Sequence, residues 1–91
     1  MEVEYSQKAL LDIQYYKESG NVKLMKKIQS LIEDMSQHPR TGIGKPEALK
    51  GDLSGLWSRI INLEHIIVYE INFETNTITI FSMKGHYTKI F

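Results

Sequence analysis

The sequence predicts an α+β fold with an N-terminal strand, a two-helix hairpin and then an antiparallel sheet of about four strands. Two observations lead to this prediction. Apolar residues recur at helical spacing only before residue 40. Residues 56–91 are instead rich in the β-branched and aromatic side chains that strands favour. This order places the helices on one face of the sheet. A length of 91 residues suits one domain, so we expect residues 1–91 to form a single unit.

The first elements expected are a short edge strand at residues 3–5 and a helix that follows it. Ser6 is a residue type that caps helix N-termini. Apolar residues then recur at helical spacing, at Ala9, Leu10, Ile13 and Tyr16. Gly20 ends this helix, because glycine readily adopts the left-handed conformation common at helix ends.

A second helix begins directly after the first. Asn21 caps it, and its apolar stripe consists of Val22, Met25, Ile28, Leu31, Ile32 and Met35. The helix ends before Pro39, because the residue preceding a proline avoids the helical conformation. With so short a joint the two helices form a hairpin, and each needs another element to cover its apolar face.

The periodicity disappears between residues 39 and 55. This segment holds four glycines and two prolines, so we expect an ordered connector with turns. Four strands are then predicted, at residues 56–63, 66–73, 77–84 and 87–91. Short polar turns at 64–65 and 74–76 separate the antiparallel neighbours.

The composition excludes several classes of site. The chain has no cysteine, which rules out a disulfide scaffold, a thiolate zinc site and a cysteine nucleophile. Its three histidines lack the spacing of metal ligands, and we expect neither a metal nor a cofactor. Eleven basic and eleven acidic residues give no net charge, which argues against a broad nucleic-acid-binding surface but not against a local one.

Membrane and secreted classes are not expected. The longest unbroken apolar stretch, residues 66–69, is far too short to span a bilayer. Residues 1–5 are acidic and lack a hydrophobic signal core, which argues against secretion. We therefore expect a cytoplasmic protein.

Specific motifs begin at residue 44. Gly-Lys-Pro-Glu-Ala-Leu-Lys at 44–50 precedes Leu-Ser-Gly-Leu-Trp-Ser-Arg at 53–59, and a His-x-x-Val-Tyr run at 65–69 and the pair His86-Tyr87 follow in order. Together with the helix hairpin upstream, these motifs resemble the YoeB branch of the RelE-type toxins over essentially the whole chain. The resemblance implies a RelE-like fold and the toxin of a type II toxin–antitoxin system. Such a toxin is a ribosome-dependent endonuclease that cleaves messenger RNA in the A site during translation.

The expected partners also come from this resemblance. It implies a YefM-like antitoxin whose C-terminal segment wraps the toxin and covers or distorts its active site. Toxin and antitoxin together usually repress their own operon, so operator DNA is expected as a partner of the complex only. The ribosome and the messenger RNA in its A site are the other expected partners, and a homodimer fits this branch of the family.

A ribonuclease that uses no metal needs a base for the 2′-hydroxyl, an acid for the leaving 5′-oxygen and a cation near the phosphate. The resemblance implies that Glu47 is the general base and His86 the general acid. Tyr87 would help to hold the substrate or its phosphate, and Lys50 would contribute positive charge nearby. The expected products are a 2′,3′-cyclic phosphate and a 5′-hydroxyl.

The same residue types also have structural interpretations. Taken alone, Glu47 beside a proline is typical of a solvated carboxylate, and Tyr87 of a half-buried strand residue. Lys45 and Arg59 are further candidates for substrate binding, and Arg59 is either a phosphate contact or a charge on a strand surface. Trp57 is expected in the core or as a wall that supports the site.

Two further features lie outside the motifs. His38 and His65 fall at a helix end and a turn, and neither is assigned a catalytic role. Residues 17–50 hold seven Lys or Arg against four Asp or Glu. This excess fits contact with ribosomal RNA through phosphate neutralisation, and it fits a solvated helix face equally well.

The chain departs from the family pattern at two positions. The resemblance leads us to expect arginine at the positions of Ile60 and Ile66, and the second arginine is the family's main stabiliser of phosphate charge. Isoleucine supplies neither charge nor donor, and loss of one such donor lowers the rate on the order of 10²–10³-fold. We therefore expect attenuated cleavage, from an engineered, detoxified chain or from a natural inactive relative. The alternative function is an inactive toxin fold that binds antitoxin, ribosome or the operator complex without cleaving RNA.

Overall fold

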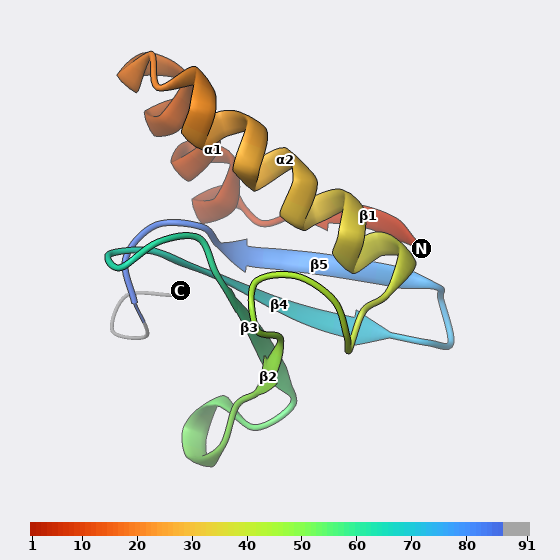
Figure 1. Cartoon of the computed structure of the whole chain (residues 1–91). Helices are drawn as coiled ribbons and strands as arrows, with labels where there is room; N and C mark the ends of the chain where they lie inside the picture. The colour runs from red at the N-terminus through yellow and green to blue at the C-terminus, as the bar shows by residue number, and fades with distance from the viewer. Residues whose placement is uncertain (87–91) are drawn as a thin grey trace.

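The computed structural model describes residues 1–86 as two helices and a five-stranded sheet (Figure 1). Strand β1 (Glu2–Tyr5) leads into helices α1 (Gln7–Ser19) and α2 (Val22–Gln37). The other strands are β2 (Glu47–Ala48), β3 (Leu56–Ile60), β4 (Ile66–Asn72) and β5 (Thr77–Ser82), with the 3₁₀ turn η1 (Gly51–Leu53) between β2 and β3. The strand predicted at 87–91 lies outside the described residues.

The sheet runs in the order β1-β5-β4-β3-β2. The pairs β2–β3, β3–β4 and β4–β5 are antiparallel, whereas β1 pairs parallel with β5, with Val3 opposite Ile78. The predicted α+β class is therefore confirmed, and the edge position expected for the first strand is confirmed too. The sheet is mixed because β5 lies between β1 and β4, and it runs parallel to β1 but antiparallel to β4.

Local capping chemistry sets the helix boundaries. The Ser6 hydroxyl accepts a hydrogen bond from the Ala9 amide (3.1 Å), and the Asn21 side chain accepts one from the Leu24 amide (3.0 Å). Gly20 has φ of 69°, the left-handed conformation expected at the helix end. All three predicted caps are confirmed. Neither helix within residues 1–86 has the length and apolar content that crossing a lipid bilayer requires.

Apolar side chains form two clusters, one on each face of the sheet. The helix-side core lies between the sheet and the hairpin, and its fully buried members include Leu31, Met35, Ile67 and Ile80. The open-face cluster lies on the opposite face and is smaller. It consists of Leu56, Ile66 and Val68, with Leu49, Leu53 and Phe81 packed against them. Figure 1 shows both helices on the same side of the sheet.

Some predicted details of the helices and strands were wrong. Leu10 is 50% exposed, because α1 packs through Ala9 and Tyr16 and the next position in the helix turns about 100° away from that stripe. Val22 is 61% exposed in the first turn of α2, at the tip of the hairpin that extends past the sheet (Figure 1). Strand β3 ends at Ile60, earlier than expected, because the Asn62 side chain accepts hydrogen bonds from the amides of residues 64 and 65 and so closes a turn. The connector is more regular than expected, since it contains β2.

Candidate functional site

The register of the sheet brings several of the predicted residues to its open face, opposite the helices. In the antiparallel ladder Glu47 faces Ser58, Ser58 faces Val68, and Ile60 faces Ile66. Residues directly opposite each other in antiparallel strands point to the same side of the sheet. Glu47 and the two isoleucines at the expected arginine positions therefore share one face. Residues far apart in the sequence become neighbours through this pairing.

Glu47 is exposed, and the backbone around it is held on both sides. The Gly44 carbonyl accepts a hydrogen bond from the Ile60 amide (2.7 Å), and the Leu49 amide donates to the Leu56 carbonyl (2.9 Å). Between these bonds, Gly44 and Lys45 adopt φ of 80° and 51°, and these left-handed residues turn the chain into β2. The carboxylate of Glu47 is thus presented to solvent from a fixed backbone.

Arg59 points to the opposite face and lies fully buried under the end of α2. All five of its N–H groups donate hydrogen bonds within the chain. The acceptors are the Tyr69 hydroxyl, the Asp34 carboxylate and the carbonyls of His38, Thr41 and Ile43. The expectation that Arg59 contacts a substrate phosphate is corrected accordingly, because no donor remains to reach one. Arg59 instead ties the connector that leads to Glu47 onto the sheet.

The electrostatics around Arg59 agree with this structural role. Its hydrogen bond holds the pKa of the Asp34 carboxyl below the ordinary value, and the Ile43 amide supports the same shift. Burial raises the pKa of Tyr69, partly opposed by Arg59. The Tyr69 hydroxyl donates in turn to the Pro39 carbonyl (2.8 Å). The buried positive charge is thus neutralised by a carboxylate and surrounded by fixed dipoles.

The two isoleucines occupy different environments although they are direct partners across β3 and β4. Ile66 is 4% exposed and belongs to the open-face cluster with Leu56 and Val68, whereas Ile60 is 42% exposed. Ser58, which is two positions before Ile60 on the same face, is buried at 3% exposure. The positions expected to hold two cations therefore form an apolar patch that merges with a small core.

His86 follows a residue that is bonded to the start of β4. The Ile66 amide donates to the Gly85 carbonyl (3.0 Å), which holds the residue before His86 against the start of β4. The His86 Nε2 atom is 3.2 Å from the Leu63 carbonyl oxygen, and the side chain is exposed. Tyr87 lies outside the described residues. The register therefore places Glu47 and the two isoleucines on one face, and the bond at Gly85 holds the residue before His86 beside the start of β4.

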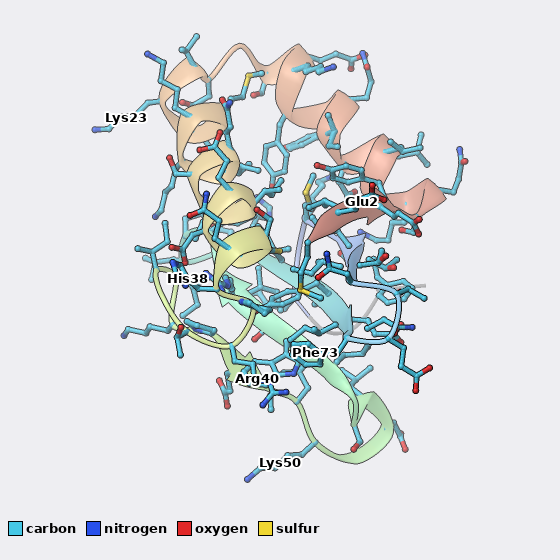
Figure 2. All side chains as sticks on the ribbon, turned by 90° about the vertical axis from the view of Figure 1, so that its right-hand side faces the viewer. Glu2, Lys23, His38, Arg40, Lys50 and Phe73 are labelled. Carbon is cyan, nitrogen blue, oxygen red and sulfur yellow. The ribbon has the colours of Figure 1, made fainter. Side chains whose placement is uncertain are left out.

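The lysines predicted to bind substrate are both exposed. Lys50 extends from the tip of the projection formed by β2 and η1, away from the helices (Figure 2). Lys45 instead borders a groove of about 510 Å³ between α2 and the end of β3. The groove is lined by Lys27, Ser30, Leu31, Ile43, Gly44, Lys45, Ile60 and Leu63.

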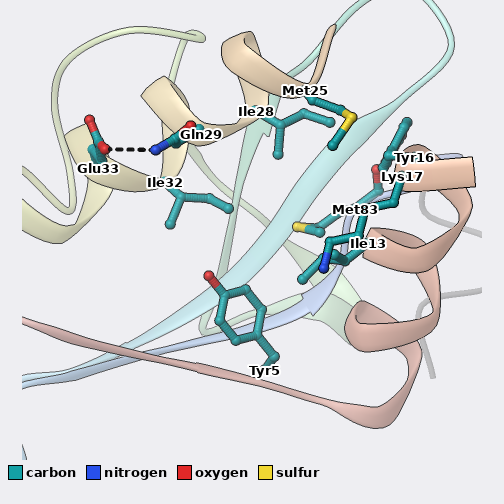
Figure 3. A pocket seen from close by; sticks show the side chains of 10 residues that line it. All are labelled: Tyr5, Ile13, Tyr16, Lys17, Met25, Ile28, Gln29, Ile32, Glu33 and Met83. Carbon is teal, nitrogen blue, oxygen red and sulfur yellow. Dashed lines mark hydrogen bonds between the residues drawn. The ribbon is translucent and has the colours of Figure 1, made fainter. Parts of the chain in front are cut away.

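A separate cavity of about 210 Å³ lies between the hairpin and the strands β1 and β5 (Figure 3). Apolar side chains such as Ile13, Met25 and Ile28 line most of it. Among residues 1–86, none of the predicted site residues lines this cavity. It lies on the helix side of the sheet, opposite the face that carries Glu47.

The sequence interpretation missed a polar cluster that anchors the segment before His86. Asp12, 6% exposed, accepts hydrogen bonds from the Met83 amide and from Lys8 Nζ, both 2.9 Å. Lys8 also donates to the Ser82 hydroxyl (2.9 Å). A signal existed, because Asp12 falls on the stripe of Ala9 and Tyr16, where a charged residue must find a partner. No cluster of three or more His, Asp or Glu suited to a metal ion occurs within residues 1–86.

Known proteins match this chain in sequence and in fold over most of its length. The family model for the YoeB-like toxin of bacterial type II toxin–antitoxin systems matches residues 5–87. Toxin YoeB of Synechocystis sp. is 38% identical over 89 residues, which cover 98% of this chain and all of that protein. A YoeB/ParE toxin structure from Agrobacterium tumefaciens superposes with a TM-score of 0.89 at 31% identity, covering 96% of this chain and all of the other. YoeB of Staphylococcus aureus, solved in complex with YefM and as a dimer, is 40% identical over 96% of this chain and 98% of its own, with TM-scores of 0.82 and 0.81.

Proposed function

The chain belongs to the YoeB-like toxins of bacterial type II toxin–antitoxin systems, and from that premise we propose that it cleaves messenger RNA in the ribosomal A site of the bacterial cytoplasm. Glu47 is proposed as the general base that takes the proton of the 2′-hydroxyl. His86 is proposed as the general acid that protonates the leaving 5′-oxygen. Tyr87 would assist in holding the phosphate, and the reaction would need no metal.

One observation supports this proposal above the others. The pairing of β2 with β3 puts Glu47 on the face shared by Ile60 and Ile66, and the bond from the Ile66 amide to the Gly85 carbonyl holds the residue before His86 at the start of β4, although 39 positions separate Glu47 from His86 in the sequence. A base and an acid must stand on opposite sides of the reacting phosphate in such a cleavage. Lys45 and Lys50 are exposed on the connector on either side of Glu47 and would supply positive charge.

The same face supports the proposal of attenuation. Ile60 and Ile66 form a cross-strand pair where the family pattern leads us to expect two arginines. An apolar pair cannot stabilise charge that develops on a phosphate, and Arg59 cannot replace it because its donors are occupied. Cleavage is therefore proposed to be slow in this chain, on the order of 10²–10³-fold below a chain with a positioned donor.

The test is a translation reaction with ribosomes held at a defined codon, in which new messenger RNA ends are mapped by primer extension. We expect weak cleavage by the chain itself and cleavage about 10²–10³-fold faster by the Ile60→Arg, Ile66→Arg variant. In that variant, Glu47→Gln should lower the rate about 10²–10⁴-fold. Glu70→Gln is the matched control, because Glu70 is an exposed carboxylate on the same face, opposite Leu56.

The outcomes separate the parts of the proposal. Fast cleavage by the unaltered chain would overturn attenuation but leave the assignments of base and acid intact. Failure of both chains to cleave would overturn the endonuclease proposal, provided that the arginine variant is folded. Because Ile66 is buried, Ile60→Arg alone serves as a second variant at a half-exposed position.

A second candidate function is favoured by the same apolar pair. A toxin fold that has lost its phosphate site would still bind antitoxin, ribosome or the operator complex without cleaving RNA. Growth after induction without antitoxin distinguishes the two functions. Arrest that requires Glu47 favours the enzyme, whereas normal growth with retained binding favours the inactive binding protein.

A YefM-like antitoxin is the proposed partner, since the Staphylococcus aureus relative forms a YoeB–YefM complex. The groove beside Lys45 supports this proposal, because its exposed Ile43, Ile60 and Leu63 would accept apolar side chains. Lys27 and Lys45 at its border would attract acidic ones. Operator DNA would be bound through that complex, and a homodimer is proposed because the same relative was also solved as a dimer.

A further inference from the structure

His65 occupies the end of the turn between β3 and β4, where its backbone is fully engaged. Its amide donates to the Asn62 side chain (2.9 Å), and its carbonyl accepts from the amides of Ile61 (3.0 Å) and Asn62 (3.2 Å). The side chain is only 14% exposed. The imidazole therefore projects from a rigid turn, and it lies outside the set of proposed catalytic groups.

The imidazole contacts the segment that carries His86. The Gly85 amide donates a hydrogen bond to Nδ1 of His65 at 2.8 Å. A backbone amide can only donate, so Nδ1 must be unprotonated and the ring proton must sit on Nε2. The Nε2 atom faces the Glu64 carboxylate at 3.9 Å, the side on which a proton is favoured. The ring packs edge-on against Tyr16, with centroids 5.8 Å apart.

Two further bonds join the same turn to the same segment. The Ile66 amide donates to the Gly85 carbonyl (3.0 Å), and Nε2 of His86 lies 3.2 Å from the Leu63 carbonyl. Both polar groups of the Gly85 backbone are thus held by residues 65 and 66. Gly85 itself has φ of 79°, so the chain turns sharply at this point before His86.

The other end of this segment is anchored to α1. Asp12 accepts from the Met83 amide, and the Tyr16 hydroxyl donates to the Met83 carbonyl (2.6 Å). Burial beside Asp12 raises the pKa of Tyr16, so the phenol remains a donor. Hydrogen bonds therefore hold residues 83–85 at both ends, from α1 to Met83 and from His65 to Gly85.

We propose that His65 is a positioning residue for His86. Its neutral imidazole accepts a hydrogen bond from the Gly85 amide at Nδ1 and so sets the direction in which the chain leaves Gly85. The catalytic meaning of this positioning rests on the proposed function of His86. The contact itself does not depend on that function. Loss of the acceptor would leave the Gly85 amide unpaired in a half-buried position and would release the backbone immediately before His86.

Two isosteres of histidine separate this role from general packing. In His65→Asn the side-chain oxygen lies close to the place of Nδ1 and can still accept from Gly85. In His65→Gln the amide group reaches the place of Nε2 and leaves the Gly85 amide without its acceptor. Both variants are neutral and polar, so a merely structural role would affect them alike.

The first test measures amide hydrogen exchange by NMR in the full chain, with no RNA or ribosome. We expect His65→Gln to lower the protection of the Gly85 amide about tenfold and His65→Asn to lower it much less. The Ile61 amide is the internal control, because it donates to the backbone carbonyl of residue 65 in every variant. Equal Gly85 protection in the two variants would overturn the proposal.

The unaltered chain supplies a second test in case a variant fails to fold. The ¹⁵N signal of His65 at neutral pH should show an unprotonated acceptor at Nδ1 and a proton on Nε2. A protonated Nδ1 would contradict the proposal whatever the variants do.

Cleavage then tests the link to His86, in the Ile60→Arg, Ile66→Arg background. We expect His65→Gln to reduce kcat about 10- to 100-fold with little change in KM, and His65→Asn to restore most of it. A rise in KM with kcat unchanged, or equal losses of kcat in both variants, would overturn the positioning role. If none of these chains cleaves RNA while Gly85 protection differs as expected, the contact stands and the proposed endonuclease function fails.

Discussion

Arg59 and Ile60 are adjacent in β3, yet their side chains lie on opposite faces of the sheet and differ in burial. Arg59 lies fully buried on the helix side, where five hydrogen bonds hold it. Ile60 is 42% exposed on the open face, opposite Ile66. The charged residue is thus the structural one, and the apolar residue marks the proposed site. Because successive side chains of a strand point to opposite faces, neighbouring residues can have a structural role and a role in the proposed site.

The difference lies in what each face must satisfy. A buried guanidinium is tolerated only where every donor has an acceptor, so the connector and α2 are arranged around Arg59. The open face carries only a small cluster, and we expect substitutions at its exposed positions to change the free energy of unfolding little. Changes to the proposed chemistry can therefore accumulate there while the fold persists.

The largest expected effect is that of Arg59→Met. Removing the guanidinium leaves Asp34 and three carbonyls without their donor, and we expect the free energy of unfolding to fall by about 3–5 kcal/mol. Urea denaturation measures this. Arg40→Met is the control, because Arg40 is the other arginine of the chain and lies exposed over the Phe73 ring at 4.6 Å (Figure 2). It should cost about 0.5–1 kcal/mol. Equal losses would mean that the buried network contributes little.

Gly44→Ala should have the next largest effect. A Cβ at Gly44 would lie 2.6 Å from Leu31 Cδ2 and 3.3 Å from Arg59 Cβ, and φ is 80°. Steric overlap and the left-handed conformation together should cost about 2–4 kcal/mol, measured by thermal or urea unfolding.

Gly51→Ala separates the two contributions to that cost. Gly51 has φ of 65° but no neighbour within 4 Å of a Cβ. Only the conformational part, about 1–2 kcal/mol, is expected there. A loss at Gly51 as large as that at Gly44 would show that close packing on the helix side does not restrict the connector.

The open face should respond unequally at its two isoleucines. Ile66→Ala removes a buried member of the open-face cluster and should cost about 2 kcal/mol, at the low end for such truncations because the cluster is small. Ile60→Ala should cost less than about 1 kcal/mol, because that side chain is already partly solvated. Denaturant unfolding of the two variants gives the comparison. A larger loss of stability in Ile60→Ala than in Ile66→Ala would show that Ile60, and not Ile66, is the packed side chain of the pair.

The smallest expected effect is a fall in the free energy of unfolding at acidic pH, caused by Asp34 on the helix side. The pKa of Asp34 is lowered in the folded chain by its hydrogen bond with Arg59, so its carboxylate stabilises the fold above the ordinary value of 3.8. This stabilisation is lost as the pH falls from about 4 through the lowered pKa. Unfolding free energies of the chain and of Asp34→Asn, measured from about pH 6 to about pH 2, should therefore converge at the acid end. A constant difference between them would contradict the assignment.

Much of the fold was predictable because its signals are local. Ser6, Gly20 and Asn21 act on their own helix ends, and strand composition located β3, β4 and β5. The strand β2 gave no such signal, since two residues carry no periodicity and their pairing depends on β3. The parallel pairing of β1 was equally hidden, because nothing in residues 2–5 specifies the direction of a distant partner.

The site was predictable only in part. The motif around Glu47 located the connector, and the fold then placed it on the open face. The burial of Arg59 was missed although a signal existed, because Trp57, Arg59 and Ile61 alternate onto the face opposite Ser58 and Ile60. The hydrogen bond from the Gly85 amide to His65 could not be foreseen, since it joins a turn to a segment 20 residues away.

The parallel pairing of β1 with β5 also has a consequence for the order of folding. Val3 must find Ile78, and the Ser6 side chain donates to the Phe81 carbonyl across 75 positions. Contacts of such long range form late and slow the folding of small domains. During synthesis, at about 5–20 residues per second, the first strand waits several seconds before its partner exists. Helices α1 and α2 are synthesised meanwhile, but the sheet that covers their apolar faces is complete only when β5 has been made, which needs nearly all of the described chain.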